Sequence, residues 1–183
     1  VYEGLEAKIK KINFIGNKEF SDSTLKDVLY CEETRRYKYW GSGDKFDQDR
    51  LDYDKDLLKK YYYDNGYIDF RILSTTSQLV ATEKNFIINF KISEGKRYKL
   101  SDIKLETSIK DFDLFDIESL LVVENGDWFS SKKVDRSIDN IIEKASELGF
   151  AFVDVRPKLK KINENNVNLT FVVYEGSKIF IDR

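Results

Sequence analysis

The four residues Val-Tyr-Glu-Gly open the sequence at positions 1–4 and recur at positions 173–176, and a related stretch, Ile-Ser-Glu-Gly, lies at positions 92–95. An apolar residue stands five positions after the glycine of each copy: Ile9, Leu100 and Ile181. The copies are separated by roughly 90 and 80 residues, and a repeat at a period of this kind is typical of tandem copies of one module. We therefore expect two units at residues 6–95 and 96–176, with the tail of a preceding repeat at 1–5 and the start of a following repeat at 177–183.

The composition argues against several classes of function. The chain has 183 residues with 31 basic against 33 acidic side chains, and this balance makes nucleic acid a poor candidate partner, because domains that bind it present a strongly basic face. There is no histidine, which removes most zinc sites, most catalytic triads and the usual proton shuttle. No phosphate-binding loop or dinucleotide fingerprint is present. We predict that the chain is not an enzyme and takes neither a metal nor a cofactor.

Hydrophobic periodicity predicts the same order of elements in both units. In the first unit we expect strands at 7–14, 67–76 and 85–93, a short helix from Ser21 or Asp22, and a longer helix from Asp47 to about Asp64. In the second unit we expect a strand at 98–106, a short helix with Ile117, Leu120 and Leu121, a long helix after Ser130 or Ser131 with the apolar stripe Val134, Ile138, Ile141, Ala145 and Leu148, and strands with Ala151, Val153 and Val155 and with Val167, Leu169, Phe171 and Val173 facing inward. Each unit is then β-α-α-β-β, an α+β module in which two helices cover one face of a three-stranded mixed sheet.

Three groups of side chains invite a functional interpretation. Asp49, Asp52 and Asp54 crowd the start of the long helix of the first unit; a metal site is one reading, and a solvated helix start that favours anions is the preferred one. The single cysteine, Cys31, fits a small buried hydrophobe better than a nucleophile. The third group is a possible partner-binding loop between residues 30 and 45, and its aromatic residues are Tyr37, Tyr39 and Trp40.

The element order and several motifs resemble the POTRA domain. The motifs are Ile-Asn-Phe-Ile-Gly-Asn-Lys-Glu-Phe at 12–20, Tyr-Tyr-Asp-Asn-Gly-Tyr at 62–67 and the strand that ends in Glu94-Gly95. The long first loop is similar to that of the third POTRA domain of the outer-membrane β-barrel assembly family, and Tyr-Lys-Leu-Ser at 98–101 is similar to the start of the fourth. The second unit departs from the pattern, because Glu106-Thr107-Ser108 stands where many POTRA domains have Gly-Asn.

The resemblance implies the periplasmic portion of an outer-membrane protein of a Gram-negative bacterium. Such an array precedes a C-terminal membrane barrel of the same protein, receives unfolded outer-membrane proteins, and docks accessory assembly lipoproteins. It carries no catalytic residue. The alternatives are the POTRA array of a two-partner secretion transporter, and an enzyme or nucleic-acid module outside the family. The composition weighs against the last of these.

The topology of the module indicates where a partner would bind. The last strand of each unit should lie at the sheet centre, because it alternates most regularly, which leaves the penultimate strand at an edge with unpaired backbone groups. In the second unit this edge carries Pro157, the only proline of the chain, and a proline blunts an edge. We therefore predict strand addition to the edge of the first unit, at Tyr67, Ile68, Asp69, Phe70, Arg71, Ile72, Leu73, Ser74 and Thr75.

The link between the units is short. It consists of Glu94, Gly95, Lys96 and Arg97. Short links restrict the orientation of neighbouring domains without fixing it, so we predict an interdomain hinge of limited swing at these four residues.

Overall fold

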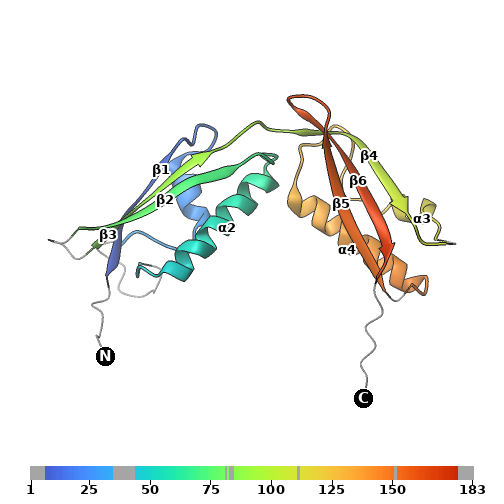
Figure 1. Cartoon of the computed structure of the whole chain (residues 1–183), viewed down its shortest axis with the longest axis horizontal. Coiled ribbons are helices and arrows are strands. Elements are labelled where there is room, and N and C mark those ends of the chain that lie inside the picture. The colour runs from blue at the N-terminus through green and yellow to red at the C-terminus, as the bar shows by residue number, and fades with distance from the viewer. Residues whose placement is uncertain are drawn as a thin grey trace, which may run out of the picture. The chain divides into compact units, whose positions relative to one another are not determined.

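The structure, a computed structural model, describes residues 7–34, 44–80, 82, 85–110, 112–150 and 152–176 (Figure 1). The predicted partial repeats at 1–5 and 177–183 and the loop aromatics Tyr37, Tyr39 and Trp40 lie outside these residues. Its contacts divide the chain into two compact units at the step from Gly95 to Lys96, apart from Asp64–Gly66, which cluster with the second unit.

The first unit has the predicted order β-α-α-β-β. Its elements are β1 (Lys8–Ile15), α1 (Asp22–Val28), α2 (Gln48–Asp64), β2 (Arg71–Val80) and β3 (Asn85–Ser93). Ser21 begins α1 as its N-cap and accepts a hydrogen bond from the Thr24 N–H at 3.2 Å, which satisfies one of the backbone donors that a helix start leaves free.

The sheet of the first unit is mixed and has the strand order β1-β3-β2. β1 runs parallel to β3, and β2 runs antiparallel to it. The central strand carries the core: Ile88 and Phe90 are fully buried, and their cross-strand partners on β1, Ile12 and Phe14, are buried with them. The last strand therefore lies at the centre and the penultimate strand at an edge, as the alternation predicts.

The second unit repeats this architecture. Its elements are β4 (Lys99–Thr107), α3 (Phe115–Glu118), α4 (Ser131–Glu147), β5 (Val153–Lys161) and β6 (Asn166–Glu175), and the strand order is β4-β6-β5. The four predicted inward residues of β6, Val167, Leu169, Phe171 and Val173, have no exposed surface. Ser130 begins α4 and accepts from the Lys133 N–H at 3.3 Å.

Two details of the second unit differ from the prediction. The short helix α3 has a single turn, and Leu120 and Leu121 lie beyond its end. Leu148 does not complete the buried stripe of α4, because the helix ends at Glu147 and the side chain is 44% exposed. The stripe instead contains Ser137, which is buried because its hydroxyl donates to the Lys133 carbonyl and accepts from the Val122 N–H.

The edge strand of the first unit begins later than predicted. β2 starts at Arg71, whereas Tyr67 to Phe70 form a turn after α2. The reason is aromatic packing: Tyr67 and Phe70 are buried, and the Phe70 ring stacks on that of Tyr62 with centroids 4.0 Å apart. Residues 67–70 therefore contribute their side chains to the core and not to the sheet edge.

Candidate functional site

β2 is the candidate partner-binding edge of the first unit. Among the described residues, β3 is the strand that pairs with β2, and the opposite side of β2 faces outward. Of the nine residues predicted to form the site, Arg71, Ile72, Leu73, Ser74 and Thr75 lie on this strand, while Tyr67, Ile68, Asp69 and Phe70 precede it. The strand continues to Val80, so the open edge is longer at its far end than the sequence indicated.

The other edge of this sheet is covered by the chain itself. The outward backbone of β1 is bonded to the segments that flank residues 35–43: the Ile9 N–H donates to the Asp44 carbonyl at 2.7 Å, and the Thr34 N–H donates to the Ile9 carbonyl at 2.8 Å. Just before the strand, the Phe46 N–H donates to the Ala7 carbonyl at 2.9 Å. These bonds occupy positions that an added strand would use.

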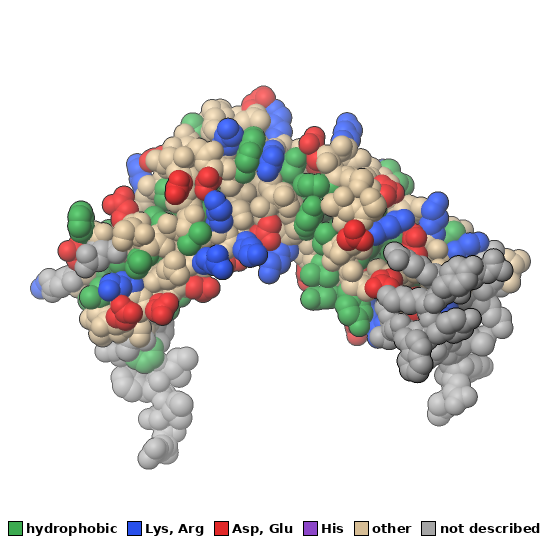
Figure 2. Space-filling model, turned by 180° about the vertical axis from the view of Figure 1, so that it is seen from behind, with side chains coloured by type: hydrophobic (Ala, Val, Ile, Leu, Met, Phe, Trp, Pro, Cys, Tyr) green, Lys and Arg blue, Asp and Glu red, His purple; other side chains and the backbone are tan. Residues whose placement is uncertain are grey.

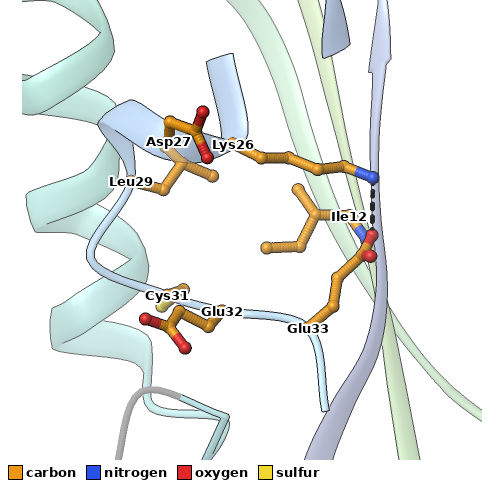
Figure 3. Close-up of a pocket in the computed structure, with 7 residues that line it drawn as sticks. All are labelled: Ile12, Lys26, Asp27, Leu29, Cys31, Glu32 and Glu33. Atoms are coloured by element: carbon orange, nitrogen blue, oxygen red, sulfur yellow. Dashed lines mark hydrogen bonds and ion pairs between the residues drawn. The ribbon is translucent and has the colours of Figure 1, made fainter. Parts of the chain in front are cut away.

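Glu33 closes the middle of the β1 edge with its side chain. Its carboxylate accepts a hydrogen bond from the Ile12 N–H at 2.8 Å and pairs with the Lys26 ammonium at 2.7 Å (Figure 3). Partial burial acts to raise the pKa of Glu33, but the Ile12 hydrogen bond and the Lys26 charge outweigh it and lower the pKa below its ordinary value. Glu33 and Lys26 also line a cavity of about 190 Å³ beside Cys31.

A groove runs between β2 and α2. Its volume is about 520 Å³, and it is lined by Lys55, Asp56, Lys59, Tyr63, Phe70, Arg71, Ile72 and Leu73. The apolar part of this lining comes from both elements, and Leu73 is 56% exposed. An extended segment added to β2 would direct alternate side chains toward this groove, because successive side chains of a strand point to opposite faces.

The sequence analysis identified the edge and missed the groove. Lys55, Lys59 and Tyr63 lie on α2, and their spacing of four residues places them on one face of that helix. The spacing was readable from the sequence, but which strand that face meets depends on how α2 lies across the sheet. A β-bulge at Leu73 also escaped prediction: the pairing with β3 passes from Ile72–Ile92 to Ser74–Lys91.

The predicted aspartate group at the start of α2 does not act as a unit. Asp54 is fully buried, and its carboxylate accepts from the Tyr30 N–H at 2.7 Å and from the Cys31 N–H at 3.3 Å. Asp52 is exposed and pairs with Lys55 at 2.6 Å. Neither the metal reading nor the solvated reading fits Asp54, because its carboxylate binds the loop after α1 to α2. Within the part of the chain that the structure describes, no cluster of side chains could hold a metal ion.

Cys31 lies against this buried carboxylate and is 2% exposed. Burial, with a further contribution from the hydrogen bond to Asp54, raises the pKa of the Cys31 thiol to about 12. A thiol with so high a pKa is protonated at neutral pH and is a poor nucleophile. The structural reading of Cys31 fits this environment.

At the end of β3, Glu94 fastens the turn between β1 and α1. The carboxylate is 7% exposed and accepts hydrogen bonds from the Lys18 N–H at 2.8 Å, the Glu19 N–H at 3.2 Å and the Tyr62 hydroxyl at 2.8 Å. Burial, and then the hydrogen bond to Glu94, raises the pKa of the Tyr62 phenol above its ordinary value. Of the four predicted hinge residues, Glu94 is therefore held within the first unit, and motion at Gly95, Lys96 and Arg97 stays a prediction.

The edge strand of the second unit has a different surface. β5 is paired with β6 from Val153 to Lys161 without a register shift, and Pro157 lies in the middle of it. A proline has no N–H to give to an added strand. The two units thus differ at equivalent strands, as the sequence predicts.

Comparison with known proteins identifies the module. A family described as POTRA, surface antigen variable number repeat, matches residues 7–95 and again residues 98–176. An outer membrane protein assembly factor BamA from Neisseria meningitidis is 25% identical over 182 residues, which cover 98% of this chain and 23% of that protein. The BamA of Nitratidesulfovibrio vulgaris is 26% identical over 187 residues and 23% of its length. The chain spans about a quarter of the length of these curated relatives.

Solved structures have the same fold. The POTRA3-5 segment of Haemophilus influenzae BamA superposes with a TM-score of 0.77 at 24% identity, over 93% of this chain and 67% of that one. A Haemophilus ducreyi BamA that lacks POTRA domains 1–3 gives a TM-score of 0.67 at 18% identity, over 92% of this chain and 29% of that one. Among the described residues, no helix is long and apolar enough to cross a membrane. The family match covers both units, and the chain therefore belongs to the POTRA family, with two tandem domains similar to those of BamA.

Proposed function

We propose that this chain is part of the periplasmic scaffold of an outer-membrane protein assembly factor, and that it binds unfolded outer-membrane proteins and accessory lipoproteins by strand addition to β2. The assignment to such a factor is supported by the names of the curated relatives. The two POTRA domains would hold a client strand by its backbone while assembly proceeds. This role needs no catalytic group, metal or cofactor.

The observation that carries the proposal is the difference between the two edges of the first sheet. The β1 edge is occupied by Asp44, Thr34 and Glu33 through hydrogen bonds of 2.7 to 2.8 Å. The β2 edge is the outer strand of the sheet, and seven of its ten residues are exposed. An added strand would therefore find its unpaired backbone groups on β2.

Backbone pairing explains how one edge can serve many partners. The N–H and C=O groups of a strand are the same whatever its sequence, so they contribute affinity with little sequence preference. The groove between β2 and α2 would supply selectivity for apolar side chains through Phe70, Ile72 and Leu73. A client with alternating apolar residues, such as a strand of an outer-membrane barrel, has this pattern.

Proline substitution tests the proposal. Ser74→Pro or Ile72→Pro removes one N–H from β2, and we expect binding of an unfolded outer-membrane protein to fall by roughly tenfold, because one or two backbone hydrogen bonds of about 1 kcal/mol each are lost. Ser74→Ala is the matched control, since it changes the side chain and keeps the N–H. Amide hydrogen exchange of β3 verifies that the sheet is intact. Equal binding by the proline and alanine variants, with an intact sheet, would remove β2 as the site.

A further inference from the structure

The β5 edge of the second unit carries a concentration of positive charge. Residues 155–162 read Val-Arg-Pro-Lys-Leu-Lys-Lys-Ile, with four cations and no carboxylate. Elsewhere acidic and basic side chains are interspersed, as the face drawn in Figure 2 shows, and the chain as a whole has a formal net charge of −2. The basic edge is therefore a local feature and not a consequence of composition.

The cations are held at regular positions. Arg156, Lys158 and Lys160 lie opposite Val172, Thr170 and Asn168 of β6. This is the side of the sheet away from the buried residues Leu169 and Phe171. Alternate residues of a strand are roughly 7 Å apart, so the three side chains form a straight row.

Neighbouring side chains leave much of this charge uncompensated. Arg156 pairs with Asp154 at 2.7 Å. The β6 residues opposite the row are uncharged. Lys158 lies 6.0 Å from the ring centroid of Tyr174, a contact that orients the ammonium group and does not neutralise it. Glu164, at the nearby hairpin turn, pairs with Lys96.

Apolar side chains are exposed among these cations. Leu159 is 43% exposed in the strand, and Ile162, directly after it, is 49% exposed. Their backbone is fixed, because Leu159 pairs with Leu169 and the Ile162 N–H donates to the Asn166 carbonyl at 2.9 Å. A rigid hairpin thus presents lysines and aliphatic residues together.

We propose that the β5 edge of the second unit binds an anionic lipid surface, with its lysines at the headgroups and Leu159 and Ile162 at the acyl boundary. Basic residues next to exposed aliphatic ones suit the interface of a bilayer, where charge and apolar burial contribute together. A peptide partner fits less well, because Pro157 withholds an N–H from an added strand. This surface is separate from β2 and would orient the domains beside a membrane while β2 holds a client.

Vesicle binding of the complete 183-residue chain tests this inference. We expect binding to phosphatidylcholine vesicles that contain phosphatidylglycerol, and little binding to phosphatidylcholine alone. Each lysine near an anionic surface contributes roughly a fivefold gain in partitioning, so the triple variant Lys158→Gln, Lys160→Gln, Lys161→Gln should bind on the order of 100-fold more weakly. Ile162→Ser should weaken binding with the lysines unchanged.

The matched control is Lys104→Gln, Lys110→Gln, Lys132→Gln, which makes the same change in net charge at exposed positions on other elements of the unit. This control should retain most of the binding. Equal loss in both triple variants would overturn the proposal, because net charge alone would then explain binding. Binding to soluble polyglutamate but not to the vesicles would also overturn it, in favour of an acidic protein segment. Hydrogen exchange of β6 verifies folding of every variant.

Discussion

Replacement of Glu94 should unfasten the first unit. Glu94→Ala would leave three donors without their acceptor: the N–H groups of Lys18 and Glu19 and the buried hydroxyl of Tyr62. An unsatisfied buried donor costs about 1 to 3 kcal/mol, and the two amides are only partly buried. We therefore expect Glu94→Ala to lower the free energy of unfolding of the first unit by roughly 3 kcal/mol, which is about a 150-fold change in the equilibrium constant.

The repeat supplies a control at the equivalent position. Glu175 ends β6 as Glu94 approaches the end of its own motif, but Glu175 is exposed. Substitution of an exposed residue away from any special contact usually changes stability by less than about 0.5 kcal/mol. Glu175→Ala should therefore leave the second unit almost unchanged, although the two glutamates occupy the same place in the sequence motif.

Native-state hydrogen exchange separates the two units in one experiment. The amides of β3 report opening of the first sheet, and those of β6 report opening of the second. Glu94→Ala should lower protection in β3 and leave β6 unchanged. Tyr62→Phe should cost about 1 kcal/mol, and its effect should shrink in the Glu94→Ala background, because the hydroxyl has by then lost its acceptor. A loss below about 1 kcal/mol for Glu94→Ala, or equal losses for the two alanine variants, would refute the reasoning.

Four further predictions concern single residues and the link. Asp54→Ala should cost roughly 2 to 3 kcal/mol, because the Tyr30 and Cys31 amides lose their acceptor, as measured by urea unfolding. Burial raises the pKa of Asp54 above its ordinary 3.8, so stability from its protonated form is present below about pH 4 and is lost as pH rises through the folded pKa; urea unfolding of Asp54→Asn should lack this pH-dependent loss. Gly16→Ala should cost roughly 2 to 3 kcal/mol, because φ is +102° and a Cβ would lie 2.3 Å from the Ile92 carbonyl oxygen, whereas Gly149→Ala, with no atom within 4 Å, should cost about 1 kcal/mol in thermal unfolding. X-ray scattering should require more than one angle between the units if the link hinges at Gly95, and a single rigid arrangement at all salt concentrations would contradict this.

Local signals carried most of the fold. The alternation in residues 85–93 predicted β3 with its observed bounds, Asn85–Ser93, because one face of this strand is fully buried. Ser21 and Ser130 were readable as helix starts, since their hydroxyls cap the backbone locally. Such patterns depend on neighbours within a few residues, and a single sequence contains them.

Non-local contacts account for the misses. Tyr67 and Phe70 have the alternation of a strand, but both side chains pack on Tyr62 of α2 and hold residues 67–70 in a turn. Asp54 stands among solvated aspartates in the sequence, and its role depends on the loop that returns to it from α1. The open edge was predictable from the order of strands, whereas the coverage of β1 required knowledge of where residues 33–34 and 44–46 lie in space.

The bulge at Leu73 sets a limit on how far a client can be held. A regular strand keeps one phase of alternation, whereas β2 changes phase between Ile72 and Ser74. An incoming strand that is in step with Ser74–Val80 is out of step with Arg71–Ile72, unless it contains an irregularity of its own. Continuous pairing would thus extend over about seven residues, or roughly 24 Å at the spacing of a strand. Such a short grip exchanges readily, and a client held this way can be handed on without unfolding either domain.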